Sequence, residues 1–381
     1  MNTSPPSSGR TALMSAVCPL CLLMIMIWST PLAAQLSAVE IWRVGELDGP
    51  PETIWARVSG ATTLNGATYV VDMLAPTVRV FDTATGAYRF DVGRSGMGPA
   101  EFARPSSAVV VGNEVWISDI IQKRTVVLDS AGSHRRTERW PGGMRGFLMR
   151  MRKQWRFGDE WRIGLTSMDN DVGKHYVIAW NGNSVADTLA SFDALAFRAR
   201  VVLTGGRDTG EFMSFTGALG PSGGMWPYND STFAIVDGWS STASLVRMGS
   251  SGPLVVSEER IESPRVLRPD SARAVEWWLG RAGIDPSSEV RLLVPPPSLP
   301  SWRRVLGDSD GNLWLQEGSA DGDFGDEAVR WARWRPGGRS EPQWLELPPG
   351  IRILSFNEGV VIGVTTDELG VQRVVAFQIV E

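Results

Sequence analysis

A serine between glycines is the first residue whose surroundings suggest catalysis. The G-x-S-x-G pattern of hydrolase nucleophiles is matched by residues 220–224, with Ser222 at its centre. In such enzymes a histidine later in the chain accepts the serine proton, and no histidine follows His175 here. We therefore interpret this segment as a flexible glycine-rich loop and assign no catalytic residue to it.

Two acidic turns carry the oxygen ligands that calcium prefers. The first holds Asp308 and Asp310, and the second holds Asp321, Asp323 and Asp326. Calcium needs about six to eight oxygens, and clustered carboxylates on a short loop can supply several of them. The full EF-hand spacing is absent, and aspartate is also a common turn former, so two solvated turns are the alternative interpretation. No cofactor is evident beyond this calcium hypothesis.

A basic stretch interleaved with aromatic residues is a candidate binding patch. Its cations are Arg150, Arg152, Lys153 and Arg156, with Trp155 among them. Aromatic side chains beside cations are typical of nucleic-acid binding, but the alternation over residues 148–157 equally fits a strand with one cationic face. The export predicted below argues against nucleic acid. An anionic glycan or the acidic face of a protein partner is therefore the expected ligand of this patch.

The composition excludes several other site chemistries. The chain has 381 residues with two His and two Cys, and its 37 basic residues include only three Lys. This scarcity argues against histidine-rich zinc sites, cysteine-ligated metals and disulfide frameworks. Apolar residues make up 43% of the chain and the formal net charge is −5. A disordered chain is thereby excluded, and the net charge gives no reason to expect nucleic-acid binding.

Residues 1–34 have the features of a secretory signal. A single positive charge, Arg10, precedes a short apolar run at residues 20–28, and small residues lead to Ala34. This order predicts cleavage after Ala34 and export to the periplasm or the extracellular space. Both cysteines lie in this segment, so the mature chain has none. The alternative is an uncleaved anchor, which would make the protein a membrane-attached sensor ectodomain.

A repeated pattern of strands and turns positions these residues. Asp72 and Asp119 each end an apolar strand, and Asp82 and Asp129 end the strand that follows; both pairs are 47 residues apart. Repeats of this length with several strands each are typical of propeller blades. We count six units, of which the last lacks one strand, and a lone strand at residues 39–44 can complete it. The sequence therefore predicts an all-β, six-bladed β-propeller of four-stranded antiparallel blades.

The predicted propeller occupies residues 35–381 as one domain. Residues 270–282 have apolar side chains at helical spacing, and prolines follow at 295–297 and 300. We expect a helical and proline-rich insertion around residues 269–300. The tryptophans lie mostly inside strand patterns, where aromatic side chains pack between blades, so we expect most of them in the core.

Charged residues near the repeat turns have structural and functional interpretations. Asp72 with Arg79, and Asp119 with Arg124, could form functional ion pairs. We interpret them as structural, because aspartate accepts backbone N–H groups in turns and arginine can span a hairpin. The same interpretation applies to Glu101.

The turn at residues 93–102 carries a family resemblance. The sequence GRSGMGPAEF, preceded by Arg-Val-Phe-Asp at 79–82 and followed by Pro105, resembles the blade-joining turn of NHL-type six-bladed propellers. Residues 367–371 resemble a segment before the final strand of uncharacterised secreted bacterial propellers. Lyases of the NHL type hold zinc with several histidines, whereas this chain has only His134 and His175. Lactonase-like propellers use Glu, Asn and Asp, but no spacing here matches theirs, so the resemblance transfers no catalytic residue.

These observations favour a binding module over an enzyme. We expect an exported, monomeric propeller whose ligand is a protein, a peptide or a glycan, bound on one face or at the mouth of the axial channel. The alternative is a metal-dependent hydrolase or lyase with carboxylate ligands at the channel. Nucleic acid is not an expected partner, and a membrane is expected only if the N-terminal segment is retained.

Overall fold

The computed structural model describes most of the chain after the predicted signal. The described residues are 35–140, 150–157, 161–167, 174–181, 184–193, 198–202, 223–229, 231–238, 240–249, 252–261, 289–294, 302–318, 328–338 and 342–381. Within these ranges, no helix is long and apolar enough to cross a membrane. The predicted signal at 1–34, Ser222 and the predicted helix at 270–282 lie outside them.

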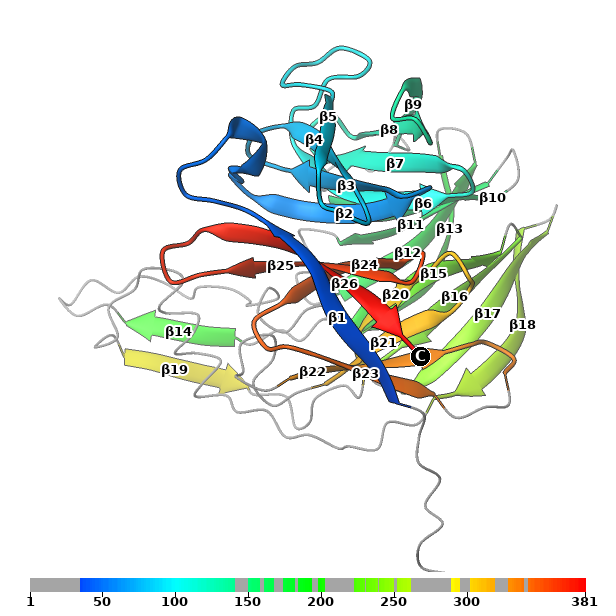
Figure 1. The fold of residues 1–381 in the computed structure, drawn as a ribbon. Coiled ribbons are helices and arrows are strands. Elements are labelled where there is room, and N and C mark those ends of the chain that lie inside the picture. Colours follow the sequence, from blue (N-terminus) through cyan, green and yellow to red (C-terminus); the bar gives the residue numbers. More distant parts are fainter. Residues whose placement is uncertain are drawn as a thin grey trace, which may run out of the picture.

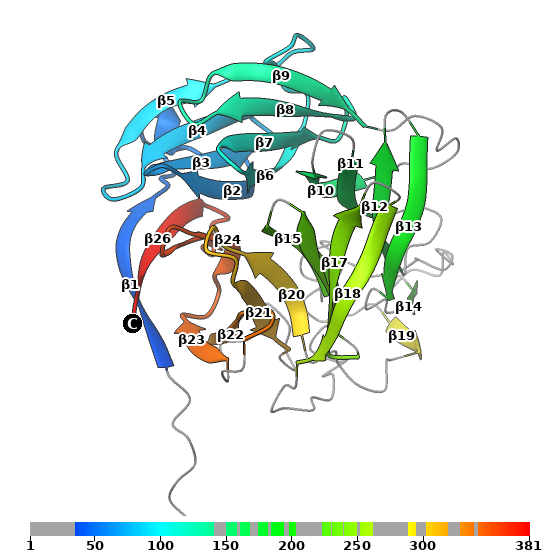
Figure 2. The same ribbon diagram turned by 90° about the vertical axis from the view of Figure 1, so that its right-hand side faces the viewer.

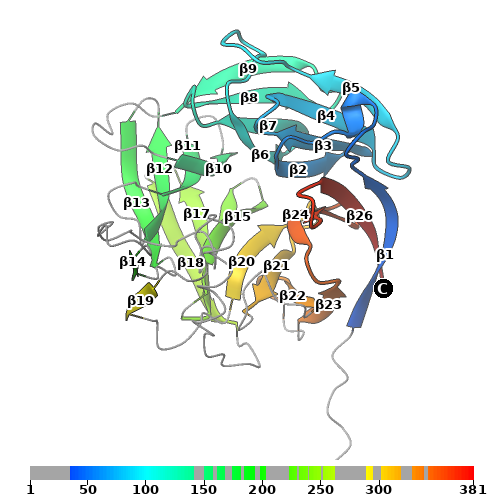
Figure 3. The ribbon, with the colours of Figure 1, turned by 90° about the vertical axis from the view of Figure 1, so that its left-hand side faces the viewer.

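Six four-stranded units follow one another around a central axis (Figures 2 and 3). Blade 1 contains β2 (Val58–Leu64), β3 (Ala67–Asp72), β4 (Thr77–Asp82) and β5 (Tyr88–Val92). Blade 2 contains β6 (Pro105–Val111), β7 (Glu114–Asp119), β8 (Arg124–Asp129) and β9 (His134–Arg139). Blade 3 contains β10 (Arg150–Phe157), β11 (Trp161–Ser167), β12 (Lys174–Asn181) and β13 (Ser184–Asp193).

The second half of the ring repeats this order. Blade 4 contains β15 (Gly223–Asn229), β16 (Thr232–Asp237), β17 (Thr242–Gly249) and β18 (Gly252–Arg260). Blade 5 contains β20 (Trp302–Gly307), β21 (Leu313–Glu317), β22 (Val329–Trp334) and β23 (Gln343–Leu347). Blade 6 contains β24 (Arg352–Asn357), β25 (Val360–Thr366), β26 (Gln372–Val380) and β1 (Gln35–Val44). The predicted all-β, six-bladed architecture is confirmed.

The N-terminal strand closes the ring as predicted. β1 pairs antiparallel with β26 from Ser37 opposite Val380 to Val44 opposite Val374, and the two strands run side by side in Figure 1. The start of β1 also pairs with β23 of blade 5, at Gln35 and Leu36. Joining the two ends of the chain removes an open sheet edge, which is why the last unit of the repeat lacks its own fourth strand.

Contacts between blades form the core. The second and third strands of blades 1 and 2 are buried on both faces, as in β3, where all six residues are buried. Large aromatic side chains fill the spaces between blades: Trp314 of blade 5 stacks on Phe356 of blade 6 with ring centroids 4.3 Å apart. Trp116, Trp180, Trp302, Trp314 and Trp331 are fully buried. The expectation that tryptophans serve the core is confirmed for these residues.

The innermost strands tie neighbouring blades together. An Nη atom of Arg304 in β20 donates to the Ile353 carbonyl oxygen in β24 at 2.7 Å. An Nη atom of Arg352 in β24 donates to the Val58 carbonyl oxygen in β2, also at 2.7 Å. These bonds satisfy backbone carbonyls near the axis and fix each blade against the next.

A small extra sheet lies outside the six blades. β14 (Arg198–Val202) and β19 (Glu289–Val294) pair antiparallel, although one precedes blade 4 and the other follows it. Figure 1 shows the pair apart from the blades. β19 lies inside the range where an insertion was predicted, and that part of the insertion is a strand.

Candidate functional site

One face of the ring is built by two kinds of connection. Each blade joins its second strand to its third by a turn, which we call the B–C turn, and its outermost strand leads to the innermost strand of the next blade. In an antiparallel blade both connections lie at the same end of the strands. We call this end of the propeller the B–C face. The single short 3₁₀ helix among the described elements, Pro51–Thr53, lies in one of these connections, between β1 and β2.

Buried aspartates anchor this face in blades 1 and 2. Asp72 is fully buried, and its carboxylate accepts hydrogen bonds from the backbone N–H groups of Ala56, Arg57, Leu74 and Ala75. Asp119, 47 residues later, does the same for Ala103, Arg104, Ile121 and Gln122. Each carboxylate thus joins a B–C turn to the incoming blade connection, and the structural interpretation of both aspartates is confirmed.

The two arginines of these blades behave differently. Arg79 lies 3.8 Å from the Asp72 carboxylate, donates to the Ile54 carbonyl oxygen at 2.7 Å and stacks over the Trp55 ring. Arg124 forms no ion pair with Asp119; it donates to the carbonyl oxygens of the joining turn, including that of Glu101 at 2.7 Å. Both arginines hold the blade connections in place.

The joining turn at residues 93–102 holds its own shape. The Glu101 carboxylate accepts hydrogen bonds from the Gly98 N–H and from Arg94, both at 2.8 Å. These bonds, that of Gly98 first, hold the pKa of Glu101 below its usual value. Gly93 has a φ of +71°, and a Cβ there would meet the buried Phe102 ring at 2.4 Å, so only glycine fits. The structural interpretation of Glu101 is confirmed.

Beside this turn lies a cavity of about 700 Å³ on the B–C face of blade 2. Its lining includes Met97 from the joining turn and Ile121 from the B–C turn, with three cations at its wall: Lys123, Arg124 and Arg139. None of its described lining residues is an aspartate or a glutamate. We call this feature the cationic cavity.

The cations of the cavity are held close together without local neutralisation. Arg124 and Arg139 lie directly opposite each other in the pairing of β8 with β9, an arrangement that destabilises a sheet when charges are alike. Lys123, next in the chain, has a φ of +49°, which is unfavourable for a residue other than glycine. Among the described residues, no carboxylate forms an ion pair with Lys123, Arg124 or Arg139.

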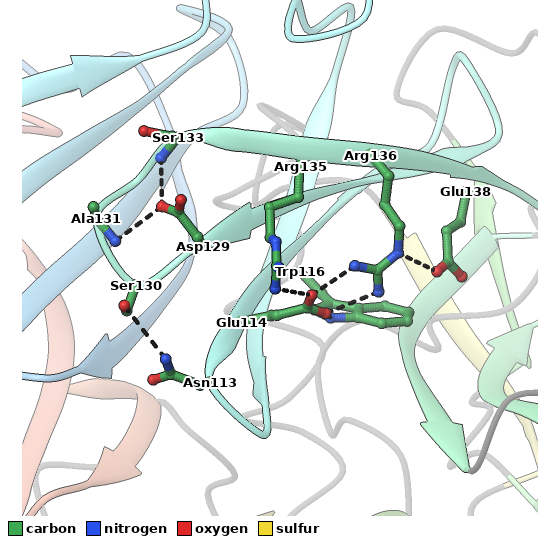
Figure 4. A network of polar contacts seen from close by, with 10 residues as sticks. All are labelled: Asn113, Glu114, Trp116, Asp129, Ser130, Ala131, Ser133, Arg135, Arg136 and Glu138. Carbon is green, nitrogen blue, oxygen red and sulfur yellow. Dashed lines mark hydrogen bonds and ion pairs between the residues drawn. The ribbon is translucent and has the colours of Figure 1, made fainter.

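The neighbouring cations of β9 are neutralised, in contrast. Figure 4 shows Arg135 and Arg136 around the Glu114 carboxylate, with contacts of 3.0 and 2.6 Å. The hydrogen bond from Arg136 is the first cause that lowers the pKa of Glu114, and Glu114 in turn raises the pKa of Arg136. Glu138 contacts Arg136 at 2.9 Å and, across to blade 3, Arg162 at 2.7 Å. The carboxylate nearest in sequence to Arg139 is therefore already paired.

The predicted calcium ligands are only partly described. Asp308 lies in the turn between β20 and β21, and its carboxylate accepts four hydrogen bonds within that turn and strand, including one from the Trp314 ring N–H at 2.8 Å. Asp310 is exposed in the same turn. Asp321, Asp323 and Asp326 lie outside the described residues. In the ranges described above, no three His, Cys, Asp or Glu side chains are grouped as metal ligands. Calcium binding stays a prediction.

The predicted basic patch lies on the innermost strand of blade 3. Arg150, Arg152, Lys153 and Arg156 belong to β10, which pairs with β11 and has an irregularity between Met151 and Lys153. The strand interpretation of this stretch is confirmed. Binding by these four residues stays a prediction.

A second cavity, of about 440 Å³, lies between the outer parts of blades 1 and 2. Its lining includes Asp91, Ser133 and His134, which are residue types of a hydrolytic triad. His134 Nε2 shares a hydrogen bond with Thr137 Oγ1 at 3.0 Å, and none of the hydrogen bonds described joins Ser133 to His134. These residues do not have the geometry of a triad.

Sequence reasoning did not find the cationic cavity. The sequence did not suggest Lys123 as a site residue. Arg139 lies at the end of a strand, and no motif surrounds it. The available signals were the rarity of lysine, with three in the chain, and a run of two cations directly after a turn. Neither signal indicates a cavity unless the pairing of β8 with β9 is known.

Comparisons with known proteins agree with the sheet topology. A family model described as DUF5128, a 6-bladed beta-propeller, matches residues 47–170, which include blades 1 and 2. A crystal structure of an exported protein from Bacteroides fragilis is 11% identical with a TM-score of 0.50, covering 92% of this chain and 98% of that one. A member of the DUF4221 family from Bacteroides vulgatus is 9% identical with a TM-score of 0.52, covering 92% and 99%. No curated protein matches the chain. At such identities the likeness concerns the fold, and it is that of a six-bladed β-propeller.

Proposed function

We propose that this propeller is a binding module that takes an anionic ligand in the cationic cavity. The observation that carries the proposal is the gathering of Lys123, Arg124 and Arg139 around a cavity of about 700 Å³ whose described lining contains no carboxylate. The cross-strand pair of Arg124 and Arg139 costs stability by like-charge repulsion. An anion bound between them would reverse that cost, since opposite charges at contact distance attract by roughly 1 kcal/mol or more.

The residues that line the cationic cavity restrict the class of ligand further. Met97 and Ile121 are 70% and 58% exposed beside the cations, so the cavity offers apolar contact together with positive charge. A carboxylate or sulfate attached to an apolar body fits this combination, because guanidinium groups bind such oxyanions with paired N–H donors. A peptide or a glycan that carries such groups is the ligand class we propose.

Calorimetric titration with citrate and with sulfate at low ionic strength tests this proposal. The wild-type chain is expected to bind at least one of them, with affinity falling as salt is added. The double variant Lys123→Gln/Arg139→Gln should bind roughly a hundredfold more weakly, about tenfold for each charge removed. Arg335→Gln is the matched control, since Arg335 is an exposed cation in the turn after β22, on the opposite face of the ring. Equal binding by the double variant and wild type would refute the cavity as the site.

We also infer that the protein works outside the cytoplasm. The predicted signal at residues 1–34 supports this, and a structural neighbour from Bacteroides fragilis carries the description of an exported protein. The joining turn at residues 93–102 supports the NHL-type resemblance, which we keep as part of the proposal. The intact mass of the exported product tests the location: a chain that begins at Gln35 is expected, and a product that retains the first 34 residues would instead favour an anchored ectodomain.

A further inference from the structure

Three adjacent blades present an aliphatic side chain at the tip of the B–C turn. Leu369 in blade 6, Leu74 in blade 1 and Ile121 in blade 2 are 79%, 56% and 58% exposed. Blades 6, 1 and 2 follow one another around the ring (Figures 2 and 3). Single exposed aliphatic residues are ordinary on protein surfaces, but here the exposure recurs at the same place in three consecutive units.

The same backbone device holds each of the three tips. In each turn an aspartate carboxylate accepts the N–H of the residue two positions later: Asp367 from Leu369 at 3.0 Å, Asp72 from Leu74 at 3.2 Å, and Asp119 from Ile121 at 3.1 Å. The backbone beneath each aliphatic side chain is thus fixed before any partner arrives. A fixed apolar contact loses less conformational freedom on binding than a mobile one.

The opposite face of the ring provides an internal comparison. Asp82 and Asp129 form turns with the same contact two residues later, at 3.1 and 2.9 Å. The residue in that position is Ala84 in one turn and Ala131 in the other. The turn geometry therefore does not require a large apolar side chain. Among these five aspartate turns, the residue two positions after the aspartate is a large aliphatic one only in the three turns on the B–C face.

A second apolar residue accompanies the tips of blades 1 and 2. Ile54, in the connection that leads into blade 1, is 40% exposed, and Met97, in the connection that leads into blade 2, is 70% exposed. Met97 and Ile121 both belong to the lining of the cationic cavity. The apolar tips therefore continue into the positively charged part of the same face.

We propose that the B–C face of blades 6, 1 and 2 docks a protein segment that combines apolar with acidic side chains. The inference rests on the proposed function, because the acidic side chain would enter the cationic cavity while the apolar ones pack on the tips. An anionic membrane fits less well, since Glu368 stands beside Leu369 in the exposed blade 6 turn and would be repelled. Charge complementarity between the cavity and an acidic segment identifies the partner.

Selection from a random dodecapeptide library on the full-length exported protein tests the proposal. We expect enrichment of peptides that place Asp or Glu close to Leu, Ile, Phe or Met. The best of them, made synthetically, should bind the variant Leu74→Ser/Leu369→Ser at least tenfold more weakly than wild type, because buried leucine side chains contribute strongly to binding. Leu254→Ser, which alters an aliphatic side chain 65% exposed in β18 of blade 4, is the matched control and should bind as wild type does.

The outcomes separate this inference from the proposed function. The tip variant Leu74→Ser/Leu369→Ser should retain wild-type binding of citrate or sulfate, since it leaves the cavity cations in place. If these anions bind but no acidic, apolar peptide class is enriched, or the tip variant binds the peptide equally well, the docking surface is refuted and the anion site stands. Tip-dependent binding to vesicles of anionic phospholipid without peptide enrichment would overturn the protein partner in favour of a membrane. If neither anion nor peptide binds, both proposals fail.

Discussion

Blades 1 and 2 share a scaffold and differ in a few residues at one end. In both, a buried aspartate holds the B–C turn to the incoming connection. Blade 1 has Pro76 and Thr77 where blade 2 has Lys123 and Arg124, and its outer strand ends at Val92 where that of blade 2 ends at Arg139. The arginine of blade 1, Arg79, is 7% exposed and covered by Trp55 and Asp72. The two blades therefore show the same turn without and with cations that form no ion pair with a described carboxylate.

The difference shows how much a repeat architecture can vary at the surface of a fixed turn. The aspartate anchor fixes the turn, and the residues around it change without altering the fold. Blade 2 retains like charges opposite each other in a sheet, an arrangement that costs stability and that the proposed anion site would explain. The following changes test that contrast.

Replacing the buried aspartate that both blades share should have the largest effect on stability, and the effect should be similar in the two blades. Asp72→Ala and Asp119→Ala each leave four backbone N–H groups without their acceptor. We expect a loss of about 3 kcal/mol of unfolding free energy in either variant, measured by urea denaturation. Asp82→Ala, at an exposed turn of blade 1, is the comparison and should cost less. A loss below that of Asp82→Ala in either variant would contradict the shared role.

Making blade 2 resemble blade 1 should stabilise the protein while it weakens anion binding roughly a hundredfold, about tenfold for each charge removed. Arg139→Val introduces the residue that ends the outer strand of blade 1 and removes the repulsion from Arg124, for a gain of about 0.5 kcal/mol. Lys123→Gly relieves the positive φ of +49°, for up to about 1 kcal/mol. Urea denaturation and citrate titration of the same samples measure the two effects. A destabilised double variant would show that the cations serve the fold and not a ligand.

Acidification should have the smallest effect on the stability of the fold, and it should affect both blades. The Arg89 side chain and the Thr85 hydroxyl and N–H lower the pKa of Asp82 in blade 1 from 3.8 to about 2, and Arg136 lowers that of Glu114 in blade 2. A carboxylate with a lowered pKa stabilises the fold fully above its ordinary pKa and loses this contribution as pH falls through the lowered value. Asp82 should lose its contribution between about pH 4 and pH 2. Arg89→Gln should raise the carboxyl pKa of Asp82 in a ¹³C NMR titration, and an unchanged value would contradict the role of Arg89.

The predictability of each strand follows from its burial. The strands detected from sequence, such as β3 and β8, are buried on both faces and read as apolar runs. The outer strands β5 and β9 are largely exposed, so their side chains carry little periodic signal. Ring closure by β1 was predictable because the last unit lacked a strand and the first strand had no unit.

The candidate site was far less predictable. Asp72, Asp119 and Glu101 could be interpreted from sequence because each accepts hydrogen bonds from backbone N–H groups two or three positions away in its own turn. Lys123 and Arg139 are 16 positions apart and Met97 precedes both. They meet only because β8 and β9 pair and the joining turn from blade 1 lies beside them. No short sequence pattern indicates that these residues lie close together in space.

The sequence by itself therefore determined the repeat, the number of blades, the closing strand and the aspartate turns, since each follows from periodic burial or from hydrogen bonds to residues two and three positions later. The hydrogen bonds that join Asp72 and Asp119 to the incoming connections span 15 or 16 positions and emerged only from the structure. Only the tertiary structure decided which cations remain unpaired and which turn tips share a face. Charge neutralisation depends on distance in space: Arg135 and Arg136 reach Glu114 across the sheet, whereas Arg139, a few residues further along the same strand, meets Arg124 instead.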